Sequence, residues 1–398
     1  MTRDELGYWL RLTLTPGVGD VSARKLLASF GLPQAIFQQS PVALSQVVSE
    51  RQAAALMQEP PELAALAETT WQWLQGAHAG VPEWRHVAVL GDEAYPPALL
   101  TLEDPPLIVY LLGARWIVED ALTLGLDVQA AAMQALNLSL SNSLAVVGSR
   151  NPTPQGASNA REFSRALSEA GMTIISGLAL GVDGAAHDGA LLGLGTGRER
   201  LATLAVVGTG LDRVYPQAHR KLAHRIADQG LLISEYPLGT PPLAPNFPKR
   251  NRLISGLSQG TLVIEAALKS GSLITARLAS EQGKDVFAIP GSIHSAQARG
   301  CHALIKQGAK LVENIQDVLE ERLTAAPAVA ETAVALDFQA EGDDALLEAL
   351  GFDPVGMDAL QARTGLDTAA LQVALMTLEL EGHVARLPGG LFQRMASA

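Results

Sequence analysis

The strongest local concentration of positive charge in this sequence lies just after Phe247, where Lys249, Arg250 and Arg252 occur within four residues. Cationic side chains follow a phosphate backbone, and an aromatic ring beside them can stack on a base. The segment therefore has the chemistry of a binding site for a single nucleic-acid strand. The residues alone leave a second interpretation open, a charged helix end that only faces solvent.

Three further loops contain glycine and directly follow aliphatic runs. Residues 146–156 are VVGSRNPTPQG, residues 176–187 are SGLALGVDGAAH and residues 206–221 are VVGTGLDRVYPQAHRK. Glycine lets backbone N–H groups approach an anion, a serine hydroxyl can donate a hydrogen bond, and arginine can form a bidentate pair with phosphate. The residues of these loops that we expect to contact a strand are Gly148, Ser149, Arg150, Gly177, Arg220 and Lys221.

The loops lack the patterns of nucleotide-dependent enzymes. Neither G-x-G-x-x-G nor G-x-x-x-x-G-K-[ST] occurs in the sequence, so neither a nicotinamide enzyme nor a P-loop ATPase is indicated. The single cysteine, Cys301, excludes an internal disulfide framework, and together with His294 and His302 it lacks a recognisable metal-ligand spacing. We therefore expect no catalytic residue, no metal and no cofactor.

Polar residues near the glycine loops have structural interpretations. Asp183 and His187 lie four residues apart at a predicted helix start, where a capping arrangement is expected. Glu265 ends an aliphatic run, and we expect it to accept hydrogen bonds from N–H groups of the loop that follows it.

From residue 144 to about residue 320, aliphatic runs alternate with helical segments. Near-continuous runs of valine, isoleucine and leucine are typical of parallel strands that are buried on both faces. The expected fold class is α/β, with a doubly wound, mostly parallel, Rossmann-like sheet. Because ligands bind such sheets beyond the carboxyl ends of the strands, where the strand order reverses, the four loops should converge at that edge.

The segments on either side have other patterns. Residues 1–80 have the spaced leucines of a small helical domain of helix-hairpin-helix or SAM-like type. Residues 341–398 predict three helices and two short strands, the order of a winged helix. The expected domains are 1–80, helical; 82–323, Rossmann-like, with a core at 144–320 and an insertion at 114–143; 324–340, a linker; and 341–398, a winged helix.

The charges of the winged-helix segment do not favour recognition of DNA bases. From 343 to 398 there are eight acidic residues and three arginines, and the expected recognition helix, DTAALQVALMTLELEG, is apolar and acidic. A base-reading helix needs cationic or amide side chains near phosphate. A partner-binding or purely structural role is therefore favoured for this domain.

The overall composition restricts where a nucleic acid can bind. The chain has 398 residues, 48% of them hydrophobic, and a net charge of −12. Because phosphate binding needs concentrated lysine and arginine, any such site must be local. The N-terminal residues do not resemble a signal peptide, and no apolar run reaches the roughly 20 residues of a membrane span, so we expect a cytoplasmic protein.

Several segments, in this order, resemble the DNA-processing A (DprA, also called Smf) family. They include GTGLDRVYP (208–216), FPKRNRLIS (247–255) and SGSLITA (270–276), and the resemblance covers the sheet domain at about 144–320. It implies a homodimeric, non-enzymatic protein that binds single-stranded DNA, protects incoming DNA and loads RecA onto it in natural transformation. It also adds Ser272 to the expected strand-contacting residues. The chain departs from the family pattern at His219, where asparagine is usual, and at 300–302, where Gly-Cys-His replaces Gly-Thr-Asn.

Two other functions compete with this interpretation. One is a nucleotide phosphoribohydrolase of the lysine-decarboxylase-like group, but of its Pro-Gly-Gly-x-Gly-Thr motif this chain has only Pro290, Gly291 and Ser292. The other is a transcriptional regulator that reads DNA with its winged helix, which the acidic residues of that segment oppose.

Overall fold

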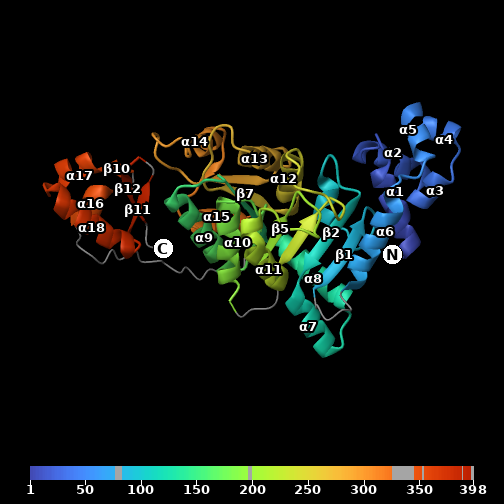
Figure 1. Ribbon diagram of the computed structural model, residues 1–398, viewed down its shortest axis with the longest axis horizontal. Helices are drawn as coiled ribbons and strands as arrows, with labels where there is room; N and C mark the ends of the chain where they lie inside the picture. Colours follow the sequence, from blue (N-terminus) through green and yellow to red (C-terminus); the bar gives the residue numbers. More distant parts are fainter. Residues whose placement is uncertain (77–82, 196–199, 325–344, 352–353, 388, 396–398) are drawn as a thin grey trace.

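The computed structural model describes residues 1–76, 83–195, 200–324, 345–351, 354–387 and 389–395. Within them, a nine-stranded sheet with the order β1-β2-β6-β5-β4-β3-β7-β8-β9 forms the centre of the molecule (Figure 1). Its strands are β1 (Trp84–Val89), β2 (Ile108–Gly113), β3 (Ser143–Val147), β4 (Thr173–Ser176), β5 (Thr203–Val206), β6 (Leu231–Ser234), β7 (Gly260–Val263), β8 (Asp285–Ala288) and β9 (Lys310–Leu311).

The strands from β3 to β9 pair in parallel, which confirms the expected α/β fold class. From β3 the chain first adds β4, β5 and β6 on one side, then returns and adds β7, β8 and β9 on the other. The strand order therefore reverses between β3 and β7. The strands β1 and β2 extend the sheet beyond β6 in antiparallel orientation.

Helices cover both faces of the sheet, because its central strands are apolar on both sides. One layer contains α7 (Arg115–Leu124), α8 (Val128–Ser141), α12 (Asn246–Leu257), α13 (Ser272–Glu281) and α14 (Arg299–Lys306). The opposite layer contains α9 (Pro154–Glu169), α10 (Val182–Gly193), α11 (Arg220–Gln229) and α15 (Gln316–Thr324). Short 3-10 turns lie at Pro97–Thr101 and Gln217–His219.

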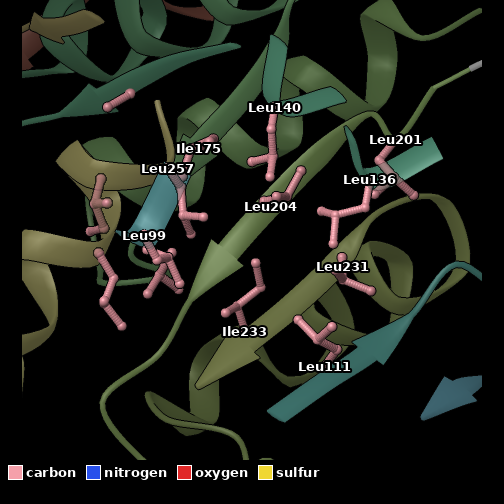
Figure 2. Packing of buried hydrophobic residues seen from close by; sticks show 14 of the residues in the cluster. Leu99, Leu111, Leu136, Leu140, Ile175, Leu201, Leu204, Leu231, Ile233 and Leu257 are labelled. Atoms are coloured by element: carbon pink, nitrogen blue, oxygen red, sulfur yellow. The ribbon is translucent and has the colours of Figure 1, made fainter. Parts of the chain in front are cut away.

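The segment 114–143, expected as an insertion, forms α7 and α8 and packs in the main core. Figure 2 shows Leu136 and Leu140 of α8 close to Leu201 and Leu204. All four side chains are buried. These helices cover strands that would otherwise be exposed, and that the segment is an insertion stays a prediction.

The N-terminal region is helical, as its leucine spacing predicts, and it shares a core with the sheet. Its first helix starts with a capping box between Thr2 and Glu5. Buried leucines of the region join the same hydrophobic cluster as Val87 and Tyr110 of the sheet, and the rings of Trp73 and Tyr110 are 6.2 Å apart. The helices are α1 (Arg3–Leu14), α2 (Asp20–Phe30), α3 (Pro33–Phe37), α4 (Pro41–Ser45), α5 (Glu50–Leu56) and α6 (Leu63–Gln75).

The C-terminal elements follow the order of a winged helix. They are α16 (Ala345–Leu350), β10 (Val355–Gly356), α17 (Met357–Thr364), α18 (Thr368–Leu380), β11 (Val384–Leu387) and β12 (Leu391–Arg394). The strands form a small antiparallel sheet with the order β10-β12-β11. Buried side chains of the helices and this sheet, among them Leu360, Leu375 and Phe392, form a separate small core. The linker expected at 324–340 lies outside the described residues except for its first residue.

Figure 1 shows these C-terminal elements at one end of the molecule and α1 to α5 at the other. In the part of the chain that the structure describes, no helix has both the length and the apolar composition needed to cross a bilayer.

Candidate nucleic-acid interface

A pocket of about 470 Å³ lies where the strand order reverses. Its walls are the loop after β3, the loop after β7 and the first turns of α12 and α13. This is the position at which doubly wound sheets bind ligands. Six of the expected strand-contacting residues line the pocket: Gly148, Ser149, Arg150, Phe247, Arg250 and Ser272.

The outer part of the pocket carries a cation beside an aromatic pair. Arg150 is exposed, and its Cζ lies 5.8 Å from the centre of the Phe247 ring. The Phe247 ring is in turn 5.5 Å from that of Tyr215, at an interplanar angle of 40°. A half-exposed ring next to a free guanidinium can stack on a base while the cation pairs with a neighbouring phosphate.

Arg250 lies at the base of the pocket and is only 3% exposed. It donates a hydrogen bond to the carbonyl oxygen of Val206, and its Nε has no hydrogen-bond partner among the described residues. Burial lowers the pKa of Arg250 to about 10, and the nearby Asp183 opposes that shift, so the side chain stays charged at neutral pH. Arg250 therefore faces the pocket from its base and is covered on its other sides.

Gly177 has no side chain and so leaves room for Arg250, and none of its own atoms lines the pocket. A Cβ at this position would overlap the guanidinium of Arg250. Gly148 lines the pocket, but its missing side chain also serves packing, because a Cβ there would lie 2.7 Å from Val182 and 2.9 Å from the carbonyl oxygen of Glu265. Gly177 therefore shapes the pocket from behind, and Gly148 forms part of its wall.

Two of the expected cations, Arg252 and Lys249, do not line the pocket. Arg252 is only 7% exposed, its Nη2 lies 2.5 Å from Oε2 of Glu235, and its Nε lies 3.0 Å from a carboxylate oxygen of Asp104. Lys249 lies 3.3 Å from Asp20 and 3.4 Å from Glu235. These carboxylates pair with the charges of Arg252 and Lys249, and Asp20 joins α12 to the N-terminal helices.

Of the remaining residues expected to contact a strand, the two serines line the pocket and the two cations lie outside it. Ser149 is nearly buried, and its hydroxyl accepts a hydrogen bond from the N–H of Asn151 at 3.1 Å. Ser272 begins α13, and its hydroxyl lies 2.7 Å from that of Ser270. Arg220 and Lys221 are exposed at the start of α11, outside the pocket lining.

Asp183 and His187 belong to the loop architecture behind the pocket. The Asp183 carboxylate accepts hydrogen bonds from the N–H groups of Gly177 and Ala179, which precede its helix, and burial raises its pKa. His187 is fully buried, with Nε2 accepting from the N–H of Leu178 at 3.3 Å and Nδ1 2.7 Å from Thr203 Oγ1. The expected capping of their own helix is wrong, since both side chains hold the preceding loop instead.

Glu265 also has a different partner from the one expected. It accepts hydrogen bonds from the N–H and the hydroxyl of Thr153, at 2.9 and 2.6 Å, and burial raises its pKa. The expectation that it binds the loop after β7 is wrong. The carboxylate instead fixes the start of α9 and so the far end of the loop that carries Arg150.

Lys269 and Asn251 also line the pocket and were missed in the sequence. Lys269 stands directly before the Ser-Gly-Ser segment at the start of α13, a signal that could have indicated it. Among the lining residues, Arg150, Arg250 and Lys269 are cationic and Asp183 is the single acidic residue. The pocket is therefore locally positive on a chain whose net charge is −12.

The two departures from the family pattern have defined surroundings. The Nδ1 atom of His219 lies 3.0 Å from the carbonyl oxygen of Leu178, so this histidine connects the third glycine loop to the second. Cys301 is buried beside the carbonyl oxygens of Val263 and Ile264, and burial raises the pKa of its thiol to about 12. The ring of His302 instead lies 2.9 Å from the carbonyl oxygen of Gly291. Within the described residues, no cluster of three or more potential ligands could hold a metal ion.

Comparison with known proteins gives concordant matches. The sequence model of a family described as DNA recombination-mediator protein A matches residues 133–323, and that of the DprA winged helix domain matches residues 325–390. Protein Smf of Escherichia coli is 41% identical over 317 residues, which are 77% of this chain and 76% of that protein.

One solved structure shows the same likeness, and a second resembles this chain in sequence. The structure of DNA processing protein A from Streptococcus pneumoniae covers 81% of this chain and 98% of its own, with 34% identity and a TM-score of 0.60. A structure of DNA processing protein A from Helicobacter pylori, described for its single-stranded DNA binding mode, covers 60% of this chain and 97% of its own, with 29% identity and a TM-score of 0.49.

Proposed function

Because the chain belongs to the DNA recombination-mediator protein A family, which includes the DprA and Smf proteins, we propose that it binds single-stranded DNA in the pocket between β3 and β7. In this proposal it protects incoming DNA and loads RecA onto it during natural transformation in the cytoplasm. The main observation that supports this DNA site is the placement of Arg150 over Phe247 at the mouth of a locally cationic pocket.

The shape of the site favours a single strand over a duplex. Phe247 and Tyr215 offer ring faces for stacking, and stacking requires bases that are not already paired and stacked within a duplex. Serine hydroxyls and the start of α13 line the opposite wall, where they can donate to phosphate oxygens. Phosphate and stacking contacts carry little sequence information, so the expected binding is non-specific.

The local charge sets the salt dependence of the proposed binding. Arg150 and Lys269 are exposed, so they can exchange solvent counterions for phosphate. Arg250 is buried and contributes a fixed positive potential from below, and after burial itself the nearby Arg150 also lowers the pKa of Arg250. Affinity should therefore fall steeply with salt even though the whole molecule is acidic.

We also propose that the protein acts as a homodimer and without catalysis. The sheet ends at β9 in a free edge within the described residues, and Leu311 on that edge is 41% exposed. Ile293, on the loop after β8, is 73% exposed. An exposed edge strand with apolar neighbours can pair with a second copy, which agrees with the apolar character of residues 285–320.

A titration of the purified chain against single- and double-stranded oligonucleotides at two salt concentrations tests the proposed function. We expect a strong preference for the single strand and a clear loss of affinity at the higher salt. Assays for nucleoside monophosphate hydrolysis on the same preparation test the phosphoribohydrolase alternative. Hydrolysis without DNA affinity would replace the proposed function with that enzyme.

A further inference from the structure

Helix α18 of the winged helix carries apolar side chains on two faces. Its inner face is buried in the small C-terminal core. On its outer face, Val373, Met376 and Leu380 are 68%, 64% and 81% exposed. A helix that is apolar all round is normally buried all round. The buried inner residues are Leu371, Leu375 and Leu378.

The outer residues have the spacing of a helix-packing seam. Together with the exposed Ala369, they follow one another at intervals of four, three and four residues. This is the alternation of a and d positions in a heptad repeat, which places side chains in one line for packing against a second helix. No part of the chain that the structure describes covers this line, since all four side chains are exposed.

The charges around this outer face are acidic. Asp367 caps the start of α18, and Glu379 and Glu381 lie beside Leu380 at its end. Neither glutamate forms an ion pair among the described residues. The arginines of the domain make contacts within the domain itself. Arg363 donates to the carbonyl oxygen of Ala349, and Arg394 donates to that of Leu347. Arg386 lies over the Phe392 ring.

We propose that the outer face of α18 binds a basic amphipathic helix of a partner protein. The partner's apolar residues pack between Val373, Met376 and Leu380, and its lysines or arginines pair with Glu379 and Glu381. A second copy of the same face is disfavoured, because two acidic surfaces repel each other. DNA is disfavoured for the same reason, since α18 carries no lysine or arginine.

This surface is separate from the proposed DNA site. No residue of α18 lines the pocket between β3 and β7, and the winged helix has its own core. The result of the test for partner binding is therefore independent of the result of the test for single-strand binding.

The experiment uses the full chain and a labelled synthetic peptide roughly three heptads long, with leucine at the a and d positions and lysine or alanine elsewhere. A second peptide has glutamate in place of each lysine. Fluorescence anisotropy should show binding of the lysine peptide only. The Val373→Ser, Met376→Gln double variant should weaken that binding roughly ten-fold or more, and the Glu379→Gln, Glu381→Gln variant should reduce its salt dependence.

A matched control replaces Leu122 and Leu124 of α7, which are 65% and 69% exposed, by serine and glutamine. This variant should bind the lysine peptide within two-fold of the wild type, and thermal unfolding should show that all three double variants remain folded. Equal binding of the two peptides, or equal losses in the α18 and α7 variants, overturns the proposal. So does a fall in oligomer mass on light scattering of the α18 variant alone, which would identify a second copy as the occupant.

Discussion

Arg250 and Gly177 depend on each other at the base of the pocket, because the glycine leaves the space that the guanidinium fills. We expect Arg250→Ala to lower the free energy of unfolding by on the order of 2 kcal/mol or more, since it removes a buried hydrogen-bonded cation beside Asp183. Gly177→Ala should destabilise through steric overlap. Denaturant unfolding measures both.

Arg220→Ala serves as the control for these variants, because that arginine is exposed at the start of α11. Its unfolding free energy should stay within about 0.5 kcal/mol of the wild type. If Arg250→Ala were as stable as Arg220→Ala, the structural role assigned to Arg250 would be wrong.

His187 makes stability depend on pH. Burial lowers the pKa of His187 to about 3, whereas the unfolded chain binds this proton near pH 6.5. The unfolded state therefore gains a proton first on acidification, so stability is fully retained above about pH 6.5 and falls as the pH decreases toward 3. Between pH 7.5 and 5.5 this residue should account for a loss of about 1 kcal/mol.

Replacing His187 with glutamine should make the change in unfolding free energy between these pH values smaller by that amount. The comparison is between pH slopes, so a uniform destabilisation of the variant does not affect it. Equal slopes for the two proteins would mean that the buried ring titrates normally, contrary to its contacts with Leu178 and Thr203.

At the scale of elements, the winged helix and the N-terminal helices should respond differently to truncation. A chain ending at residue 324 loses the C-terminal elements, which have their own core, so we expect single-strand affinity within about three-fold of the full chain. Removing residues 1–76 instead uncovers apolar surface of β1 and β2 and separates Asp20 from Lys249 and Arg252. That truncation should lower the melting temperature by several degrees or more.

Melting curves and titrations on the two truncated chains check this prediction. A loss of DNA affinity on removing the winged helix alone, with the melting temperature unchanged, would place part of the DNA site in that domain.

Much of the element order could be predicted from the sequence, because aliphatic runs and helical periodicity are local signals. The site could be predicted only in part. Glycine loops after strands indicate the correct edge of a parallel sheet, so Arg150 and Phe247 were found. Local sequence does not show which cations meet carboxylates from distant segments, and Asp20, Asp104 and Glu235 come from three separate parts of the chain. The burial of Arg252 could not be predicted for that reason, nor could that of Arg250, whose neighbours Val206 and Asp183 also come from other segments.

At the scale of the whole molecule, the proposed dimer makes a prediction for mass in solution. Light scattering at micromolar concentration should give twice the mass of the chain. Leu311→Lys should shift the protein toward the monomer, because it places a charge on the free edge at β9. Leu122→Lys is the control, since its side chain is exposed on α7. A monomeric wild-type protein contradicts the proposed dimer.

The proposed binding of single-stranded DNA in the locally cationic pocket at the strand-order reversal predicts a specific change in the salt dependence of affinity for Arg150→Ala. Two reference variants accompany it. Phe247→Ala should lose about 1–3 kcal/mol of affinity with an unchanged slope, because stacking releases no counterion. Arg277→Ala should match the wild type, since that arginine lies on α13 outside the pocket lining, with a side chain 68% exposed.

Arg150→Ala itself should weaken binding to all single-stranded sequences by roughly five-fold and reduce the slope by about 0.7, with an unchanged melting temperature. An Arg150→Ala protein with the affinity and salt slope of the wild type would show that DNA does not bind in this pocket.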